Sequence, residues 1–130
     1  MGPSIPLSLA AIAVGATLGA WLRWGLSVWL NARVETLPIG TLAANLIGGY
    51  LIGLAVGFFH DWPELSPAWR LLAITGFLGG LTTFSTFSAE AVVLLERGAY
   101  GGALLHTSVH LLGSIALCIA GLATWRWLSA

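Results

Sequence analysis

Four long apolar segments dominate the sequence, at about residues 7–29, 38–59, 67–96 and 103–127. Each could cross the hydrocarbon core of a bilayer, which is about 30 Å thick and requires about 20 residues of helix. Only 8% of the 130 residues are charged, whereas soluble domains carry roughly a quarter. The sequence therefore predicts an all-α membrane protein with four transmembrane helices, in a single membrane domain that covers residues 1–130.

Glycines recur along one face of the first and second segments. Gly15 and Gly19 form a G-x-x-x-G pair in the first segment. Because glycine has no side chain, such a face allows another helix to approach closely. We therefore expect tight helix packing here and along the second segment, whose glycines recur at near four-residue spacing: Gly40, Gly48, Gly49, Gly53 and Gly57.

The charges favour neither a nucleic-acid partner nor one membrane orientation. The formal net charge is zero, from five basic and five acidic residues, so no excess of basic residues indicates nucleic-acid binding. Four spans would divide the arginines almost evenly, with Arg23, Arg33 and Arg97 on one side and Arg70 and Arg126 on the other. The positive-inside rule then gives almost no preference. Such a chain could insert both ways, and two opposite copies would form an antiparallel homodimer.

The third segment contains a polar stretch, TGFLGGLTTFSTFSAE, at residues 75–90. A Gly-Gly pair followed by two threonines forms helix poorly, and the segment is too long for one straight crossing. Irregular backbone at membrane depth is tolerated only inside protein or beside a water-filled cavity. We therefore expect the third helix to be broken between Gly79 and Thr83, which makes this stretch a candidate ion or substrate site.

Few other polar side chains lie within the spans. Asn45 is the only strongly polar residue of the second span, and it either lines a hydrated pathway or bridges two helices. Arg23 either extends to the membrane interface, which we favour, or faces a pore. His106, His110 and Ser114 are four residues apart and share one helical face. Two histidines could bind a metal, but the sequence offers no evident third ligand, so we expect a polar stripe instead.

Three blocks of the sequence resemble the Fluc/CrcB family of fluoride channels. They are GATLGAWLRW at residues 15–24, GTLAANLIGGYLIG at residues 40–53 and GFLGGLTTFSTFSAE at residues 76–90. The resemblance implies small four-span subunits that form a dual-topology homodimer with two pores in the inner (plasma) membrane. It also implies passive, highly selective fluoride export and a structural sodium ion, Na+, at the dimer centre.

The same resemblance implies roles for individual residues. Asn45 matches the pore asparagine of the family, and Phe84 and Phe87 match its phenylalanine pair. The backbone carbonyls of Gly79 and Thr82 from both subunits would hold the sodium ion. The remaining pore residues that the resemblance implies are three hydroxyl side chains and one carboxylate: Ser85, Thr86, Ser114 and Glu90.

These residue types suit a small, strongly hydrated anion. Hydroxyl and amide donors replace water without trapping the ion as a fixed charge would. Phenylalanine rings have a positive edge, and Phe84 and Phe87 are three residues apart, so a regular helix presents both on one face.

Two other functions fit parts of the sequence. A dual-topology, proton-coupled exporter would need an intramembrane carboxylate, for which Glu90 is the candidate. A scaffold subunit without transport activity would explain the glycine faces but not the polar stretch. We do not expect an enzyme, because the sequence shows no nucleophile–base pair.

Overall fold

The computed structural model describes residues 2–31 and 38–130. Four helical segments are long and apolar enough to cross a membrane: Ile5–Asn31, Ile39–Asp61, Pro67–Glu96 and Tyr100–Leu128. The described residues contain helices and no strand. The all-α class and the four predicted spans are therefore confirmed. Most of the turn predicted after the first span, including Arg33, lies outside the described residues.

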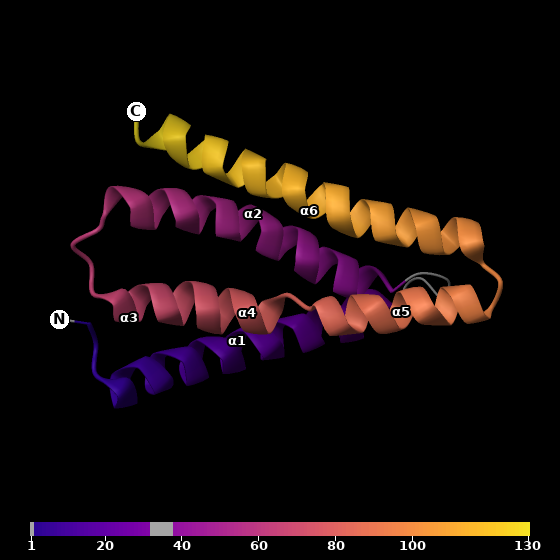
Figure 1. Cartoon of the computed structure of the whole chain (residues 1–130), viewed down its shortest axis with the longest axis horizontal. Helices are drawn as coiled ribbons and strands as arrows, with labels where there is room; N and C mark the ends of the chain where they lie inside the picture. The colour runs from indigo at the N-terminus through magenta and orange to yellow at the C-terminus, as the bar shows by residue number, and fades with distance from the viewer. Residues whose placement is uncertain (1, 32–37) are drawn as a thin grey trace.

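The first, second and fourth spans are single helices: α1 (Ile5–Asn31), α2 (Ile39–Asp61) and α6 (Tyr100–Leu128). The third span comprises α3 (Pro67–Arg70), a π-helix η1 (Leu71–Leu78), α4 (Gly79–Leu81) and α5 (Phe84–Glu96) (Figure 1). It begins where the sequence predicts, because Pro67 suits a first helical turn and the Ser66 hydroxyl accepts a hydrogen bond from the Ala68 N–H.

The third span bends at Thr82 and Thr83, within the stretch where the sequence predicts a break. Thr82 has φ −87° and ψ 156°, and Thr83 has φ −150° and ψ 126°, so both backbones are extended. Helix α4 ends just before them and α5 begins just after (Figure 1). The bend lies next to the small buried core, which includes Ala44, Leu78 and Leu81.

Glycines bring the helices into direct backbone contact, as the sequence predicts. A Cβ atom added to Gly15 of α1 would lie 2.2 Å from the carbonyl oxygen of Leu72 in η1. A Cβ added to Gly53 of α2 would lie 2.1 Å from the Cys118 carbonyl oxygen of α6. Side chains cannot fit at such distances, so these contacts fix α1 against the third span and α2 against α6.

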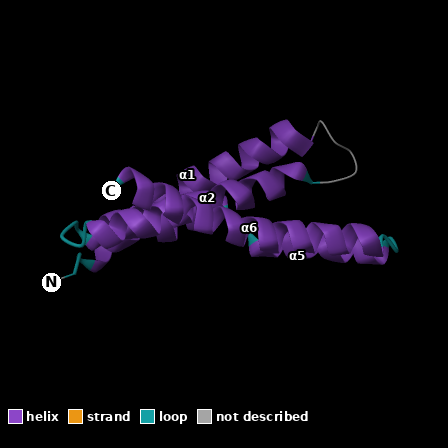
Figure 2. Ribbon diagram, turned by 90° about the horizontal axis from the view of Figure 1, so that it is seen from above, coloured by secondary structure: helices purple, strands orange, loops and turns teal. Residues whose placement is uncertain are grey.

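One end of the molecule is forked. Figure 2 shows α5 and α6 extending together, apart from the end of α1 and the start of α2. The other halves of the helices pack together as a bundle (Figures 1 and 2). The bend at Thr82 and Thr83 stands where the bundle meets the fork, because α5 follows it directly.

Candidate functional site

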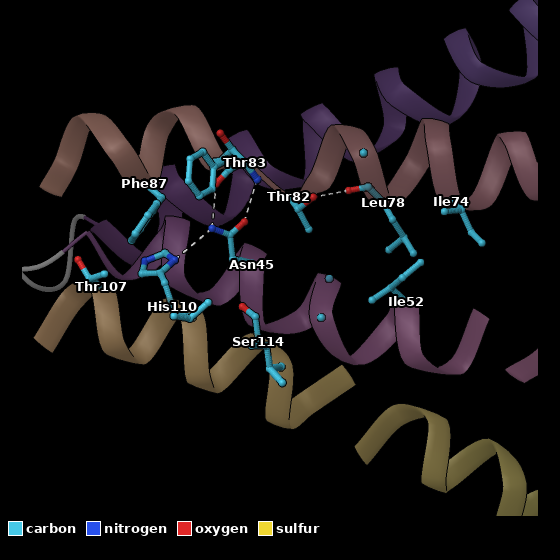
Figure 3. A pocket seen from close by; sticks show the side chains of 16 residues that line it. Asn45, Ile52, Ile74, Leu78, Thr82, Thr83, Phe87, Thr107, His110 and Ser114 are labelled. Carbon is cyan, nitrogen blue, oxygen red and sulfur yellow. Dashed lines mark hydrogen bonds between the residues drawn. The ribbon is translucent and has the colours of Figure 1, made fainter. Parts of the chain in front are cut away.

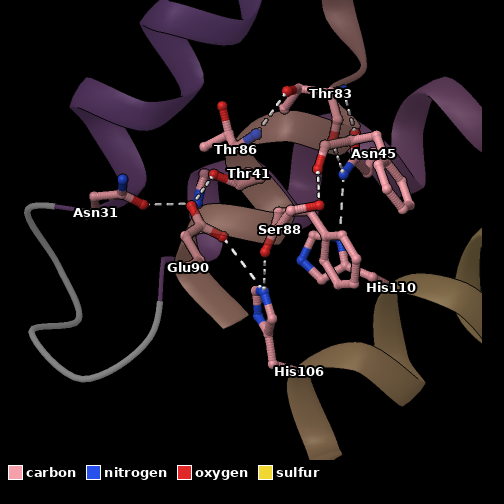
Figure 4. Close-up of polar contacts among 12 residues, drawn as sticks. Asn31, Thr41, Asn45, Thr83, Thr86, Ser88, Glu90, His106 and His110 are labelled. Carbon is pink, nitrogen blue, oxygen red and sulfur yellow. Dashed lines mark hydrogen bonds and ion pairs between the residues drawn. The ribbon is translucent and has the colours of Figure 1, made fainter. Parts of the chain in front are cut away.

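Asn45 joins three parts of the chain at the bend. Its Oδ1 accepts a hydrogen bond from the Thr83 N–H at 2.8 Å, and its Nδ2 donates to the Thr83 carbonyl at 3.0 Å. The same Nδ2 lies 3.1 Å from Nδ1 of His110 on α6 (Figures 3 and 4). Asn45 therefore bridges helices, which is one of the two roles that the sequence left open, and a role in the pathway stays a prediction.

The bend leaves two backbone carbonyls without the hydrogen bond that a continuous α-helix would give them. In such a helix, the Thr83 N–H would bond to Gly79 and the Thr86 N–H to Thr82. Here the Thr83 N–H bonds to Asn45, and the Thr86 N–H bonds to the Thr83 hydroxyl oxygen at 3.1 Å. The carbonyls of Gly79 and Thr82 therefore offer lone pairs at the bend.

Arg23 contacts the third span rather than only extending to the membrane interface. Its side chain is part-buried, and Nε donates a hydrogen bond to the Gly80 carbonyl at 3.1 Å. In a continuous helix that carbonyl would accept from the Phe84 N–H. The sequence favoured an interfacial position for Arg23. It did not predict this contact, which supports the end of α4.

A cavity of about 750 Å³ lies between α2, the third span and α6 (Figure 3). Its lining includes His110, which the sequence places on a polar stripe, and many apolar side chains. Three residues with predicted pore roles, Ser85, Thr86 and Glu90, are not among the lining residues of this cavity. The structure does bring the other predicted site residues together around it: Asn45, Gly79, Thr82, Phe84, Phe87 and Ser114.

The two phenylalanines of the polar stretch have different surroundings. Their ring centroids are 5.5 Å apart, so they are neighbours on α5. Phe84 is 80% exposed in the single chain. Phe87 packs against two imidazole rings, with centroid distances of 5.2 Å to His106 and 4.8 Å to His110. Among the described residues, Phe87 therefore has aromatic neighbours on another helix, whereas Phe84 is largely uncovered.

Glu90 is bound by α2 instead of facing the cavity. The buried Thr41 hydroxyl donates a hydrogen bond to Oε1 of Glu90 at 2.5 Å (Figure 4). The other carboxylate oxygen, Oε2, lies 3.6 Å from Nε2 of His106. Sequence reasoning missed Thr41, although its position four residues before Asn45 places both on one face of α2.

The two histidines of α6 form a cluster with Glu90. His106 is 6% exposed and His110 is 5% exposed, and their ring centroids are 4.5 Å apart. One ligand atom from each of Glu90, His106 and His110 lies within 4.8 Å of the others. The expectation that the histidines lack a third potential metal ligand is therefore wrong, because a different helix supplies it.

Comparison with known proteins identifies the family. The family described as CrcB-like protein, Camphor Resistance (CrcB), matches residues 10–122. The fluoride-specific ion channel FluC of Cupriavidus pinatubonensis is 64% identical over 124 residues, which cover 95% of this chain and 98% of that protein. FluC of Chromobacterium violaceum is 59% identical over 121 residues, covering 93% and 96% respectively. FluC of Nitrosomonas europaea is 56% identical over 119 residues, covering 92% and 94%.

These matches span all four membrane helices and include the residues at the bend. The relatives are named as ion channels, not enzymes, which agrees with the expectation from the sequence. The chain therefore belongs to the CrcB family of fluoride-specific ion channels.

Proposed function

We propose that this protein is a passive, selective channel that exports fluoride from the cytoplasm through the inner (plasma) membrane. The observation that carries this proposal is the position of Asn45, which lines the cavity beside Phe84, Phe87 and Ser114 while it holds the bend. Polar side chains and aromatic rings line this cavity together with many apolar side chains. The relatives named as fluoride-specific channels support the choice of ion.

In this proposal, donors and ring edges replace the hydration shell of fluoride in turn. Asn45 and Ser114 present polar groups, and Phe84 and Phe87 present positive ring edges. The Ser85 and Thr86 hydroxyls and the Glu90 carboxylate serve the pathway outside this cavity. No fixed cation retains the ion at the cavity, whose described lining contains neither arginine nor lysine.

The functional unit is an antiparallel homodimer with two pores. Phe84 is 80% exposed within the third candidate membrane span, although it carries a predicted pore role, and a second copy would cover it. The nearly balanced arginines favour insertion in both orientations. The bend separates α3, η1 and α4 from α5, and in this dimer the bends of the two copies would meet near the centre.

A structural sodium ion fits the donors at the bend. Hard cations prefer oxygen ligands, and the carbonyls of Gly79 and Thr82 lack their usual helical hydrogen bonds. Two subunits would supply four such carbonyls. The bound ion would add a shared positive charge that holds the two bends together.

Fluoride efflux from liposomes tests the channel function. Purified protein should release fluoride down its gradient, with much slower release of chloride, and without any pH gradient. Uphill fluoride movement driven by a pH gradient alone would favour the proton-coupled exporter built on Glu90. Absence of any ion flux from folded protein would favour a scaffold subunit.

Cysteine labelling tests the dual topology. Arg97→Cys, in a chain whose Cys118 is replaced by Ser, places a single thiol in the turn between α5 and α6. Membrane-impermeant reagents should label this thiol from both faces of the membrane. Labelling from one face alone would contradict an antiparallel dimer.

A further inference from the structure

We propose that Glu90, His106 and His110 form a binding site for a divalent transition-metal ion such as Zn²⁺. We further propose that the bound ion closes the fluoride pathway at Asn45, a step that rests on the proposed channel function. The cluster is built by α5 and α6 and lies next to Thr41 of α2 (Figure 4).

The distances suit such an ion. Zinc bonds to carboxylate oxygen and imidazole nitrogen at about 2.0 to 2.2 Å, so two ligand atoms of a tetrahedral site lie at most about 3.6 Å apart. Oε2 of Glu90 and Nε2 of His106 are 3.6 Å apart, within that limit. The ligand atoms of the whole cluster lie within 4.8 Å of one another. A side-chain rotation that moves His110 by roughly 1 Å would complete the site.

The atoms that would bind the ion include two that are buried without partners. Oε2 of Glu90 and Nε2 of His110 each expose less than 1 Å² and have no hydrogen-bond partner within the described part of the chain. The only hydrogen bond of His106 Nε2 within the described part of the chain is a long one, 3.3 Å, to the Phe87 carbonyl. A metal ion would satisfy both unpartnered atoms and would displace the weak contact of His106.

The ligand types and their support favour a transition metal over Mg²⁺ or Ca²⁺. Two neutral imidazoles and one carboxylate are a known zinc ligand set, which leaves a fourth position for water. The Thr41 hydroxyl orients the carboxylate through Oε1 and leaves Oε2 available. Glu90 is six positions before Glu96, the last residue of α5, so the site lies about 9 Å from that end along the helix axis.

Metal binding would disturb Asn45 through His110. The Thr83 N–H fixes Oδ1 of Asn45 as acceptor, so Nδ2 is the donor that faces His110. Nδ1 of His110 must accept this bond, and the neutral ring therefore carries its proton on Nε2. When a metal binds Nε2, the neutral ring carries its proton on Nδ1 instead. Two donors, this N–H and the Asn45 N–H, would then face each other. The Asn45–His110 contact must then open, which alters the group proposed to serve fluoride.

A metal titration tests the site independently of transport. The full chain, free of any affinity tag and purified in detergent, is titrated with Co²⁺ and then with Zn²⁺. We expect one Co²⁺ per subunit, with the absorption spectrum of a low-symmetry, four-coordinate site, and displacement by Zn²⁺. His106→Gln should weaken binding at least tenfold. His60→Gln is the matched control, because His60 has an 86% exposed side chain outside the cluster, and it should bind as the wild type does.

A flux assay tests the closure. Saturating Zn²⁺ should slow fluoride efflux from wild-type liposomes at least tenfold. The efflux of His106→Gln, compared with its own rate without metal, should change little at the same Zn²⁺ concentration. Size-exclusion profiles confirm that each variant remains folded.

Each result has a defined reading. Absence of saturable metal binding in folded wild-type protein overturns the site, and unchanged affinity in His106→Gln overturns the ligand assignment. Bound metal with undiminished flux overturns the closure. Absence of fluoride flux without metal contradicts the proposed function, whereas the metal titration still decides whether the site exists.

Discussion

The bundled half of this protein and its forked end are held together by different forces. In the bundle, α1 meets η1 and α2 meets α6 through glycines, and backbones touch directly at Gly15 and Gly53. At the fork, α2 is held by directional hydrogen bonds, from the Asn45 side chain to the Thr83 backbone and from the Thr41 hydroxyl to the Glu90 carboxylate of α5.

Because of this difference, we expect the bundle to determine stability and the fork to be able to exchange its contacts. Close backbone packing leaves no room for an added side chain, because any added atom collides with a neighbouring helix. Polar side chains can exchange one partner for another, including an ion or water. We therefore expect changes in the bundle to alter folding, and changes at the fork to alter transport more than stability.

The largest effect is expected in the bundle. Gly53→Val should prevent stable folding, because its Cβ would lie 2.1 Å from a backbone oxygen of Cys118, which no side-chain movement relieves. Gly25→Val is the control, since a Cβ at Gly25 meets nothing within 4 Å. Yield and size-exclusion profile in detergent measure the difference. Equal yields of the two variants would mean that the bundle tolerates separation of α2 and α6.

Asn45→Ala should impair both properties, because Asn45 stands where the two regions meet. The Thr83 N–H and carbonyl lose their partner, which costs about 1–3 kcal/mol if they stay unsatisfied. Fluoride flux should fall at least tenfold, equivalent to about 1.4 kcal/mol on the barrier. Unfolding in denaturant is measured beside liposome efflux. A flux that falls only in step with lost dimer would assign Asn45 to the fold alone.

Phe84→Ile and Phe87→Ile should reduce transport while the fold persists. Isoleucine keeps an apolar side chain but removes the ring edge, so flux should fall at least tenfold, or about 1.4 kcal/mol. Stability should change by under about 1.5 kcal/mol, and less for Phe84, which is 80% exposed in the single chain. If both variants conduct fluoride at the wild-type rate, the ring-edge mechanism does not apply here.

The smallest effect is expected from a side-chain hydrogen bond within the bundle. Tyr50 donates to the Thr124 hydroxyl at 3.1 Å, across the α2–α6 contact that the glycines already fix. Tyr50→Phe should lower stability by only about 0.5–1.5 kcal/mol and leave fluoride flux unchanged. Thermal unfolding and efflux are measured together. A large loss of flux would show that the bundle takes part in transport.

Sequence reasoning located the spans, the glycine faces and the bend, because each depends on local composition. Apolar length predicts a span, and two threonines after two glycines predict irregular backbone. The contact between Thr41 and Glu90 could not be predicted, since it depends on how α2 and α5 are rotated about their axes. The contact of Arg23 could not be predicted for a different reason, because its target is a carbonyl that only the bend exposes.

The pairing of Asn45 with Thr83 imitates one rung of a β-ladder. A side-chain amide has the same donor and acceptor as a peptide group, and here it bonds to both backbone groups of one extended residue. Aspartate offers no amide donor, and glutamine is one methylene longer, so neither reproduces the rung. Even the closest chemical substitutes for this asparagine should therefore disturb the bend, which makes position 45 a stringent target for saturation mutagenesis under fluoride stress.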